Sequence, residues 1–273
     1  MRANAVQVYR RVGHRLVTGF LETEVLDVLA AVDAAQAARG VTGSVAEVGV
    51  HHGKLFLGLH LLRRAGEFSV AVDLFGEQEL NIDGSGNGDL AKFRANVALW
   101  ADDEGLVIHQ GDSTGLSATE LRALAGVGIR MFSVDGGHTA AVVHSDMVLA
   151  EATLVPGGVV IADDVFNQQW PGVAVGTLRY LETGALVPFA IGFNKVLFTH
   201  PDYAADYRLA VERAFASRVR IATGVSTFAG HDVTLMLRQG PALILRRSET
   251  ARTVYHAGYR GMVSALSALT RRR

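Results

Sequence analysis

Short apolar runs alternate with stretches of helical periodicity along the middle of this chain, and that alternation constrains the fold more than any other feature of the sequence. An apolar run of about 4–8 residues between helical segments is typical of a parallel strand buried on both faces. We expect five such runs to be strands: Ser44–Val50, Phe68–Leu74, Leu106–Gln110, Ile129–Val134 and Gly158–Ala162. Because helical segments separate them, they predict a doubly wound parallel sheet with helices on both faces.

The segments on either side complete the predicted fold. Beyond Pro171, the apolar runs Leu186–Ile191 and Lys195–Thr199 are spaced like an antiparallel hairpin. We therefore expect an α/β fold of the Rossmann-like kind, with a mostly parallel seven-stranded sheet whose last strand is antiparallel, in a single domain over residues 1–273. Its expected parts are a helical N-terminal extension that supports a homodimer or higher homo-oligomer, a ligand-binding core and a C-terminal elaboration: residues 1–40, 44–199 and 200–273.

Composition and charge exclude several classes of protein. The longest apolar stretches, such as Gly157–Ala162, fall far short of the roughly 20 residues that span a bilayer, so no membrane-spanning segment is expected. The 26 Lys and Arg residues balance 27 Asp and Glu residues, which removes the basic field that nucleic-acid binding needs. The lack of cysteine rules out disulfides and thiolate metal ligands and is compatible with a cytoplasmic location.

The first predicted strand leads into the turn Glu47-Val-Gly49-Val-His-His-Gly53. Its glycines let the backbone approach a ligand closely. The Gly-x-Gly-x-x-Gly fingerprint of dinucleotide-binding proteins is incomplete in this turn, because a glutamate and a histidine occupy two of its three glycine positions. The acidic residue at the first position would also repel a pyrophosphate. Glu47 instead favours a ligand that offers a cation or hydroxyls.

The next two predicted strands also end in polar residues. Asp73 ends the second strand, where a carboxylate can accept both hydroxyls of a ribose. Asp112 and Ser113 follow the third, where a carboxylate can accept a hydrogen bond from an adenine amino group. Together with Glu47, these residues outline an adenosine. The combination resembles class I S-adenosylmethionine-dependent methyltransferases, and the resemblance covers residues 44–199, which it identifies as a cofactor-binding core.

Acidic residues follow the fourth and fifth predicted strands as well. The chain has Asp135-Gly-Gly-His138 after the fourth strand and Asp163-Asp164 after the fifth. Adjacent parallel strands lie about 4.8 Å apart, so the three carboxylates can converge on one small volume. They would repel one another unless a cation neutralises them, and oxygen ligands favour a hard ion such as Mg²⁺. The alternative is that Asp164 caps the following turn while Asp163 binds only water.

This pattern is similar to the macrocin-type family of metal-dependent sugar O-methyltransferases. The resemblance implies that Asp135, Asp163 and Asp164 hold the metal and that His138 is the general base. His144 becomes a rival base if His138 only begins the helix predicted to follow it. Related catechol-type enzymes usually carry Asp-Asn after the fifth strand, so the acidic pair favours a sugar acceptor.

The resemblance implies an enzyme that transfers the methyl group of S-adenosylmethionine to a sugar hydroxyl with the help of Mg²⁺. The acceptor would be a small molecule or oligosaccharide, such as a macrolide sugar. The arginine-heavy composition, with only three lysines, suggests an actinobacterial enzyme. A narrower resemblance is to the mycobacterial methyltransferases that make methylmannose polysaccharide, which implies a mannoside acceptor. Two alternatives stay open: a methyltransferase of catechol or phenol acceptors, and a cofactor-binding protein without turnover.

Two loops lie beside these motifs. The glycine-rich loop Asp83–Asp89 lacks the Lys-Ser/Thr of a phosphate-binding loop, and we expect it to be a mobile lid. The segment Asn167–Trp170 offers amides that can bind sugar hydroxyls and a tryptophan that can stack on a sugar face, or it is an ordinary polar loop.

Overall fold

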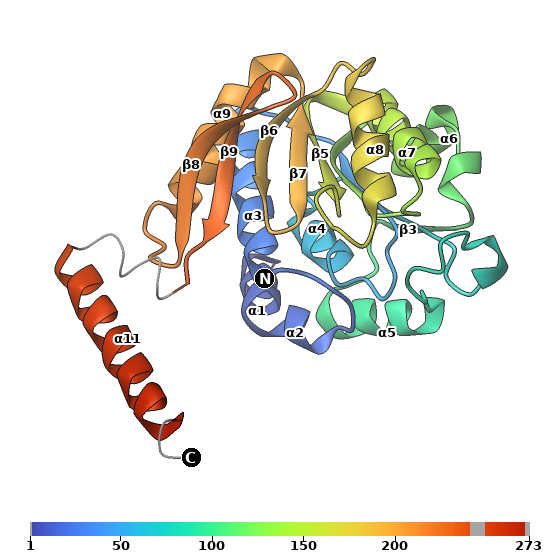
Figure 1. Cartoon of the computed structure of the whole chain (residues 1–273). Helices are drawn as coiled ribbons and strands as arrows, with labels where there is room; N and C mark the ends of the chain where they lie inside the picture. The colour runs from blue at the N-terminus through green and yellow to red at the C-terminus, as the bar shows by residue number, and fades with distance from the viewer. Residues whose placement is uncertain (1, 241–248, 271–273) are drawn as a thin grey trace.

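The computed structural model describes residues 2–240 and 249–270 of the 273-residue chain. Nine strands form one sheet in the order β3-β2-β1-β4-β5-β7-β6-β9-β8 (Figure 1). The strands are β1 (Ser44–Val48), β2 (Ser69–Asp73), β3 (Leu106–Gln110), β4 (Ile129–Val134), β5 (Leu154–Asp163), β6 (Val187–Gly192), β7 (Lys195–Thr199), β8 (Ile221–Phe228) and β9 (His231–Arg238). The α-helices are α1 (Arg2–Val8), α2 (His14–Leu16), α3 (Thr23–Ala38), α4 (Phe56–Leu62), α5 (Leu90–Trp100), α6 (Ala118–Ala125), α7 (Ala140–Thr153), α8 (Pro171–Leu181), α9 (Pro201–Phe215) and α11 (Glu249–Thr270). Short helical turns are the π-helix η1 (Tyr9–Gly13) and the 3₁₀ turns η2 (Gln78–Leu80) and η3 (Ser113–Gly115).

The parallel core and the antiparallel hairpin are confirmed, whereas the predicted number of seven strands is corrected to nine. Strands β1 to β5 pair in parallel, and β7 pairs antiparallel with both β5 and β6. The two additional strands, β9 and β8, extend the sheet beyond β6. Sequence patterning missed β8 because it is an edge strand whose residues 223–227 are all exposed, so it lacks the apolar run of a buried strand.

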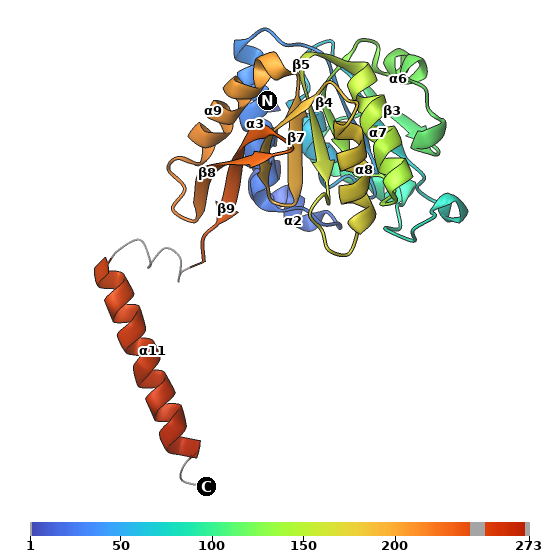
Figure 2. The ribbon, with the colours of Figure 1, turned by 45° about the horizontal axis from the view of Figure 1, so that its top comes forward.

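Helices cover both faces of the sheet (Figure 2). One face packs against α3, α4, α5 and α9 around a core that includes Leu29, Phe56 and Phe93. The other face packs against α6, α7 and α8 around Phe132 and Met147. Strands β1, β2 and β4 are therefore buried on both sides, which explains why they appear in the sequence as continuous apolar runs, whereas the edge strand β3 is only partly buried.

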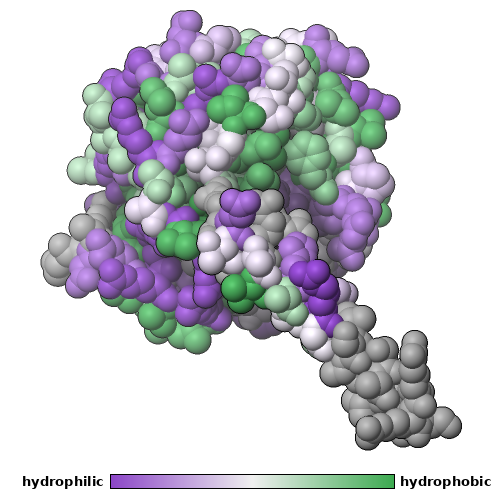
Figure 3. All heavy atoms as spheres, turned by 60° about the vertical axis from the view of Figure 1, so that its left-hand side comes forward, coloured by the Kyte–Doolittle hydropathy of each residue, from purple (hydrophilic) through white to green (hydrophobic). Residues whose placement is uncertain are grey.

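The C-terminal part of the chain is less enclosed. Figure 3 brings the side with α9, β8 and β9 forward and shows hydrophilic and hydrophobic residues interspersed over it. Helix α11 stands apart from the sheet in both ribbon views (Figures 1 and 2). Residues 241–248 and 271–273 of the predicted C-terminal elaboration lie outside the described residues. Of the helices described, none combines the length and hydropathy that a membrane span requires.

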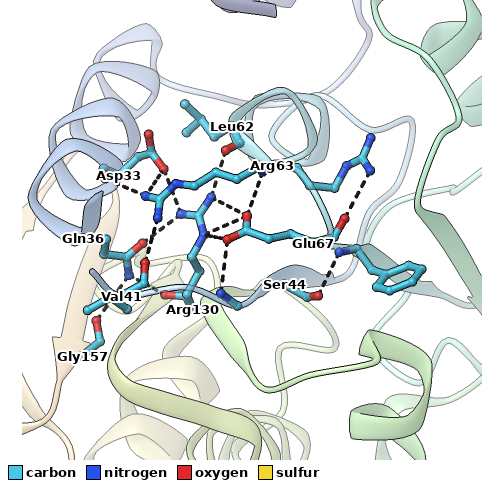
Figure 4. A network of polar contacts seen from close by, with 12 residues as sticks. Asp33, Gln36, Val41, Ser44, Leu62, Arg63, Glu67, Arg130 and Gly157 are labelled. Atoms are coloured by element: carbon cyan, nitrogen blue, oxygen red, sulfur yellow. Dashed lines mark hydrogen bonds and ion pairs between the residues drawn. The ribbon is translucent and has the colours of Figure 1, made fainter. Parts of the chain in front are cut away.

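A buried polar network ties elements together at the amino-terminal ends of the strands (Figure 4). Arg130 in β4 has no exposed surface, and its guanidinium contacts Glu67 at 3.0 Å and Asp33 at 2.9 Å. It also donates to the side chain of Gln36 and to the carbonyl of Leu62, both at 2.9 Å. Because every partner is an acceptor, the buried charge is neutralised and hydrogen-bonded, the condition under which burial of a charge is tolerated.

Candidate functional site

A cavity of about 1090 Å³ opens at the carboxyl ends of the parallel strands. The strand order reverses between β1 and β4, and in open α/β sheets ligands bind in the crevice at such a reversal. The cavity is lined by residues that follow each of β1 to β5 and by the turn between β6 and β7. Its volume slightly exceeds the usual range of about 300–1,000 Å³ for small-molecule sites, which leaves room for two reactants.

The turn after β1 is built for close approach of the backbone. Gly49 and Gly53 have φ values of 82° and 87°, in the left-handed region that favours glycine. A Cβ atom at Gly49 would lie 1.7 Å from the carbonyl oxygen of Asp135, so the turns after β1 and β4 can meet only if this residue is glycine. Gly49 lines the cavity, whereas Gly53 is not among the lining residues and packs against Phe93, where a Cβ atom would lie 2.8 Å from the ring.

Glu47 is buried at the end of β1 and lines the cavity. Its Oε2 atom has no hydrogen-bond partner among the described residues. Burial raises the pKa of Glu47 to about 8, although the ammonium group of Lys195 acts in the opposite direction. A buried carboxylate oxygen without a partner at a cavity wall is suited to a ligand that donates hydrogen bonds or carries a positive charge.

The ends of β2 and β3 line the same cavity. The carboxylate of Asp73 accepts backbone hydrogen bonds from His51 at 2.6 Å and Phe75 at 2.5 Å, which fixes its orientation. Burial raises the pKa of Asp73. Asp112 is exposed and caps η3 by accepting from the amide of Thr114, whereas Ser113 is buried. The structure thus brings Asp73, Asp112 and Ser113 to one cavity wall, as their positions at strand ends predict.

Asp163 at the end of β5 forms a buried ion pair with Lys195 of β7. The side chain of Lys195 is only 5% exposed. Burial alone would lower the pKa of Lys195, but the carboxylates of Asp163 and Asp135 outweigh it and raise that pKa. Asp135 follows β4, and burial together with the negative charge of Asp163 raises its pKa well above the usual range. The ammonium group of Lys195 therefore already neutralises part of the negative charge of these carboxylates.

Asp164 lies in the left-handed region with φ 58°. Its carboxylate accepts from the amides of Asn167 at 2.9 Å and Asn194. Burial opposes ionisation, but hydrogen bonds from His138 and these amides lower the pKa of Asp164 to about 2. Asp164 is thus an anion held at the cavity wall.

His138 lies in the cavity between two carboxylates. Its Nδ1 atom is 2.9 Å from the Ser85 hydroxyl and 3.2 Å from Asp83, and its Nε2 atom is 3.3 Å from Asp164. The backbone amide of His138 also donates to Asp83. Burial disfavours the charged ring, but Asp164 and Asp83 outweigh it and raise the pKa of His138. The indole of Trp170 stacks on the ring with centroids 4.5 Å apart, so the imidazole is fixed in orientation.

His144 occupies a different position. Helix α7 begins at Ala140 with Thr139 as its N-cap, so His138 precedes the helix rather than lying within its first turn. His144 lies inside α7 and is not among the residues that line the cavity. The structure thus brings His138 to the acidic cluster and leaves His144 outside it.

Ligand atoms suitable for a divalent cation come together at this point. One carboxylate oxygen each from Asp135 and Asp164 and a ring nitrogen of His138 lie within 4.8 Å of one another. Asp163, the third carboxylate of the predicted metal set, is instead paired with Lys195. The two carboxylate oxygens are of the kind that a hard cation prefers, whereas the imidazole nitrogen is not, and the cluster has one carboxylate fewer than the sequence predicts.

Sequence reasoning did not assign Lys195, Asn194 or Asp83 to the site. Lys195 is one of only three lysines and begins an apolar run predicted to be a strand, which was a usable signal. Asn194 belongs to no recognisable sequence motif. Only its left-handed backbone conformation, with φ 64°, sets it apart. Asp83 belongs to the predicted lid, but its contact with His138 crosses 55 positions of sequence and no local pattern encodes it.

Comparison with known proteins agrees with this geometry. Residues 46–165, somewhat less than half of the chain, match a family model described as a methyltransferase domain. A search of curated protein sequences gives no match. Among solved structures, the O-methyltransferase NovP is similar with a TM-score of 0.53 and 16% identity, over 64% of this chain and 80% of that chain. An O-methyltransferase from Bacillus cereus in complex with SAH is similar with a TM-score of 0.50 and 10% identity, over 71% of this chain and 89% of that chain. The domain match and the shared fold support a methyltransferase.

Proposed function

We propose that this protein is an S-adenosylmethionine-dependent O-methyltransferase that methylates a hydroxyl group of a sugar-containing acceptor. The observation that carries the proposal is the position of His138, an oriented imidazole in the cavity that also contains Glu47, Asp73 and Ser113. One cavity thus combines groups suited to an adenosyl ligand with a group that can remove a proton.

The cofactor end of the cavity fits a ligand with a cationic amino acid group. The unpartnered Oε2 atom of Glu47 can accept a hydrogen bond from an ammonium group. Asp73 keeps lone pairs for ribose hydroxyls beyond those used by the backbone amides of His51 and Phe75. When bound there, S-adenosylmethionine would supply an electrophilic methyl group on a sulfonium centre.

His138 is the proposed general base. Both ring nitrogens have partners, because Asp83 and Ser85 face Nδ1 and Asp164 lies 3.3 Å from Nε2. We propose that the acceptor hydroxyl approaches Nε2 beside Asp164, so that this atom takes its proton. Asp164 then stabilises the protonated ring from the Nε2 side. Because Trp170 stacks on the imidazole, the base stays aimed during the reaction.

A divalent cation such as Mg²⁺ is proposed to be held by Asp135 and Asp164, where it would polarise the acceptor oxygen. The amide side chains of Asn167, Gln168 and Gln169 line the cavity beside them. Amides both donate and accept hydrogen bonds, as the hydroxyls of a sugar do, and they support the proposal of a sugar rather than a catechol.

Methyl transfer from labelled S-adenosylmethionine to parallel panels of glycosides, including mannosides, and of catechols tests the proposal. We expect label in the glycosides, loss of turnover with His138→Ala, and loss of turnover after EDTA treatment with recovery on adding Mg²⁺. Label in catechols alone would contradict the sugar acceptor, and full activity after exhaustive chelation would contradict the metal. Cofactor binding without transfer to any acceptor would favour a binding protein.

A homodimer formed through residues 1–40 is also proposed. Val12 and Leu16 in this segment are 51% and 68% exposed, and burial of such side chains against a second copy would be favourable. Light scattering tests this point: we expect twice the mass of one chain, and the mass of a single chain would refute it.

A further inference from the structure

Three charged residues form a row across the cavity ends of β4, β5 and β7. Val134 pairs with Ala162 in the parallel register of β4 and β5, so the residues that follow them, Asp135 and Asp163, are neighbours. On the other side of β5, Asp163 pairs with Lys195 in the antiparallel register of β5 and β7. Residues opposite one another on adjacent strands point to the same face of a sheet. The sheet itself therefore places Asp163 between a carboxyl group and an ammonium group.

The protein engages both oxygen atoms of the Asp163 carboxylate. Oδ2 forms the ion pair with the ammonium group of Lys195, and Oδ1 accepts a hydrogen bond from the backbone amide of Asp164 at 2.8 Å. The side chains of Asp163 and Lys195 are 11% and 5% exposed, so solvent ions screen their attraction much less than that of a surface pair. The positive charge of Lys195 therefore stays beside Asp163.

Asp164 has partners of a different kind. Its carboxylate accepts a hydrogen bond from the neutral amide of Asn167 at 2.9 Å and lies 3.3 Å from Nε2 of His138. One of its oxygens belongs to the cluster of ligand atoms that also includes Asp135 and His138, whereas Asp163 does not belong to that cluster. The two adjacent aspartates thus differ, because Asp164 keeps its negative charge for a cation while the charge of Asp163 is neutralised.

We infer that Lys195 keeps Asp163 from binding the divalent cation, so that two carboxylates rather than three hold the ion and the affinity for the free ion is lower. The inference rests on the metal site of the proposed function. An ammonium group beside a carboxylate competes with a metal ion for it and repels the second positive charge. Mg²⁺ is commonly held in enzymes by one or two carboxylates together with substrate oxygens and water. The pair of Asp163 with Lys195 therefore leaves coordination positions for the oxygens of an acceptor. Lys195 acts through Asp163 and is a positioning residue.

Binding of Mn²⁺, followed by the loss of the electron paramagnetic resonance signal of the free ion, tests the inference without any turnover. We expect Lys195→Met to bind Mn²⁺ about 10- to 100-fold more tightly than the unaltered protein, the size of effect typical of residues that contact metal ligands. Lys92→Met, which removes an exposed lysine, is the matched control and should keep the affinity of the unaltered protein. Equal or weaker affinity in Lys195→Met would overturn the inference.

A double variant, Lys195→Met with Asp163→Leu, keeps the test decisive if Lys195→Met alone folds poorly. Replacing both members of a buried ion pair with apolar residues is often neutral for stability. We expect the double variant to bind Mn²⁺ as tightly as the unaltered protein, because the pair supplies neither a ligand nor a net charge. A loss of about 10-fold or more would show that Asp163 is itself a metal ligand, and the inference would be wrong.

The proposed function is judged separately. If the unaltered protein binds Mn²⁺ and Asp164→Asn does not, the metal site stands whatever the Lys195 variants show. If neither the unaltered protein nor Lys195→Met binds Mn²⁺, the inference fails together with the metal of the proposed function. Methyl transfer from S-adenosylmethionine in the presence of EDTA then shows whether the transferase activity itself remains.

Discussion

Replacing Asp146, which lies in α7 with no exposed surface, with asparagine measures what burial of its carboxyl group costs the fold. Burial raises the pKa of Asp146 from 3.8 to about 7. The native protein then holds this proton more tightly than the unfolded chain, so stability is full below about pH 4 and is lost as the pH rises towards 7. A shift of about three units corresponds to about 4 kcal/mol in all, of which about 3 kcal/mol is lost between pH 5 and pH 8.

Urea unfolding of both proteins at pH 5 and pH 8 measures this loss. The other titrating groups are common to the two proteins, so the difference between their free energies of unfolding isolates Asp146. We expect that difference to move by about 3 kcal/mol in favour of Asp146→Asn from the lower to the higher pH. Asp103→Asn, at an exposed position, should show no such change. A difference between Asp146→Asn and the unaltered protein that is independent of pH would refute the reasoning.

Other substitutions test the rest of the site. His138→Ala should lower kcat by about 10²- to 10⁴-fold, whereas His144→Ala should leave it unchanged, and equal losses would rule out the assignment of the base. Lys195→Met should destabilise the fold by about 3–5 kcal/mol in urea unfolding because it removes the cation that neutralises the largely enclosed carboxylate of Asp163. Lys92→Met at an exposed position should change stability by less than about 0.5 kcal/mol, and similar losses in both would refute the importance of the ion pair. Glu47→Gln should weaken binding of S-adenosylhomocysteine about 10-fold in calorimetry, and unchanged affinity would exclude its contact with the amino group.

The parallel core was predictable because its chemistry is local. Strands such as Ile129–Val134 are buried at every position, which produces a continuous apolar run in the sequence. Strand β8 gives no such signal, because its pairing with β9 supplies its backbone hydrogen bonds while most of its side chains face solvent. The number of strands therefore depended on a tertiary pairing that local patterning does not encode.

The candidate site likewise consists of residues that the sequence predicts and of partners that it does not. The residues at strand ends were predictable because parallel strands bring their carboxyl ends to one edge, as Glu47 and Asp73 illustrate. The partners of these residues come from elsewhere in the chain: Lys195 reaches Asp163 across an antiparallel register pair, and Asp83 reaches His138 from a loop. Such pairings determine the charge balance of the site, and they required the three-dimensional structure.

The ion pairs and hydrogen bonds of Arg130 hold neighbouring elements together at one end of the sheet. They join α3, the segment before β2 and β4 through ionic contacts at the end opposite the cavity, and opening that end would expose several buried charges at once. We expect amide hydrogen exchange to be slowest around Arg130 and to quicken along each strand towards the cavity loops. Because these contacts hold the amino-terminal ends of the strands together, the loops at the opposite end can be lengthened or replaced without disturbing the contacts of Arg130. Changes in the loops can therefore alter the lining of the cavity while the ionic contacts of Arg130 stay in place.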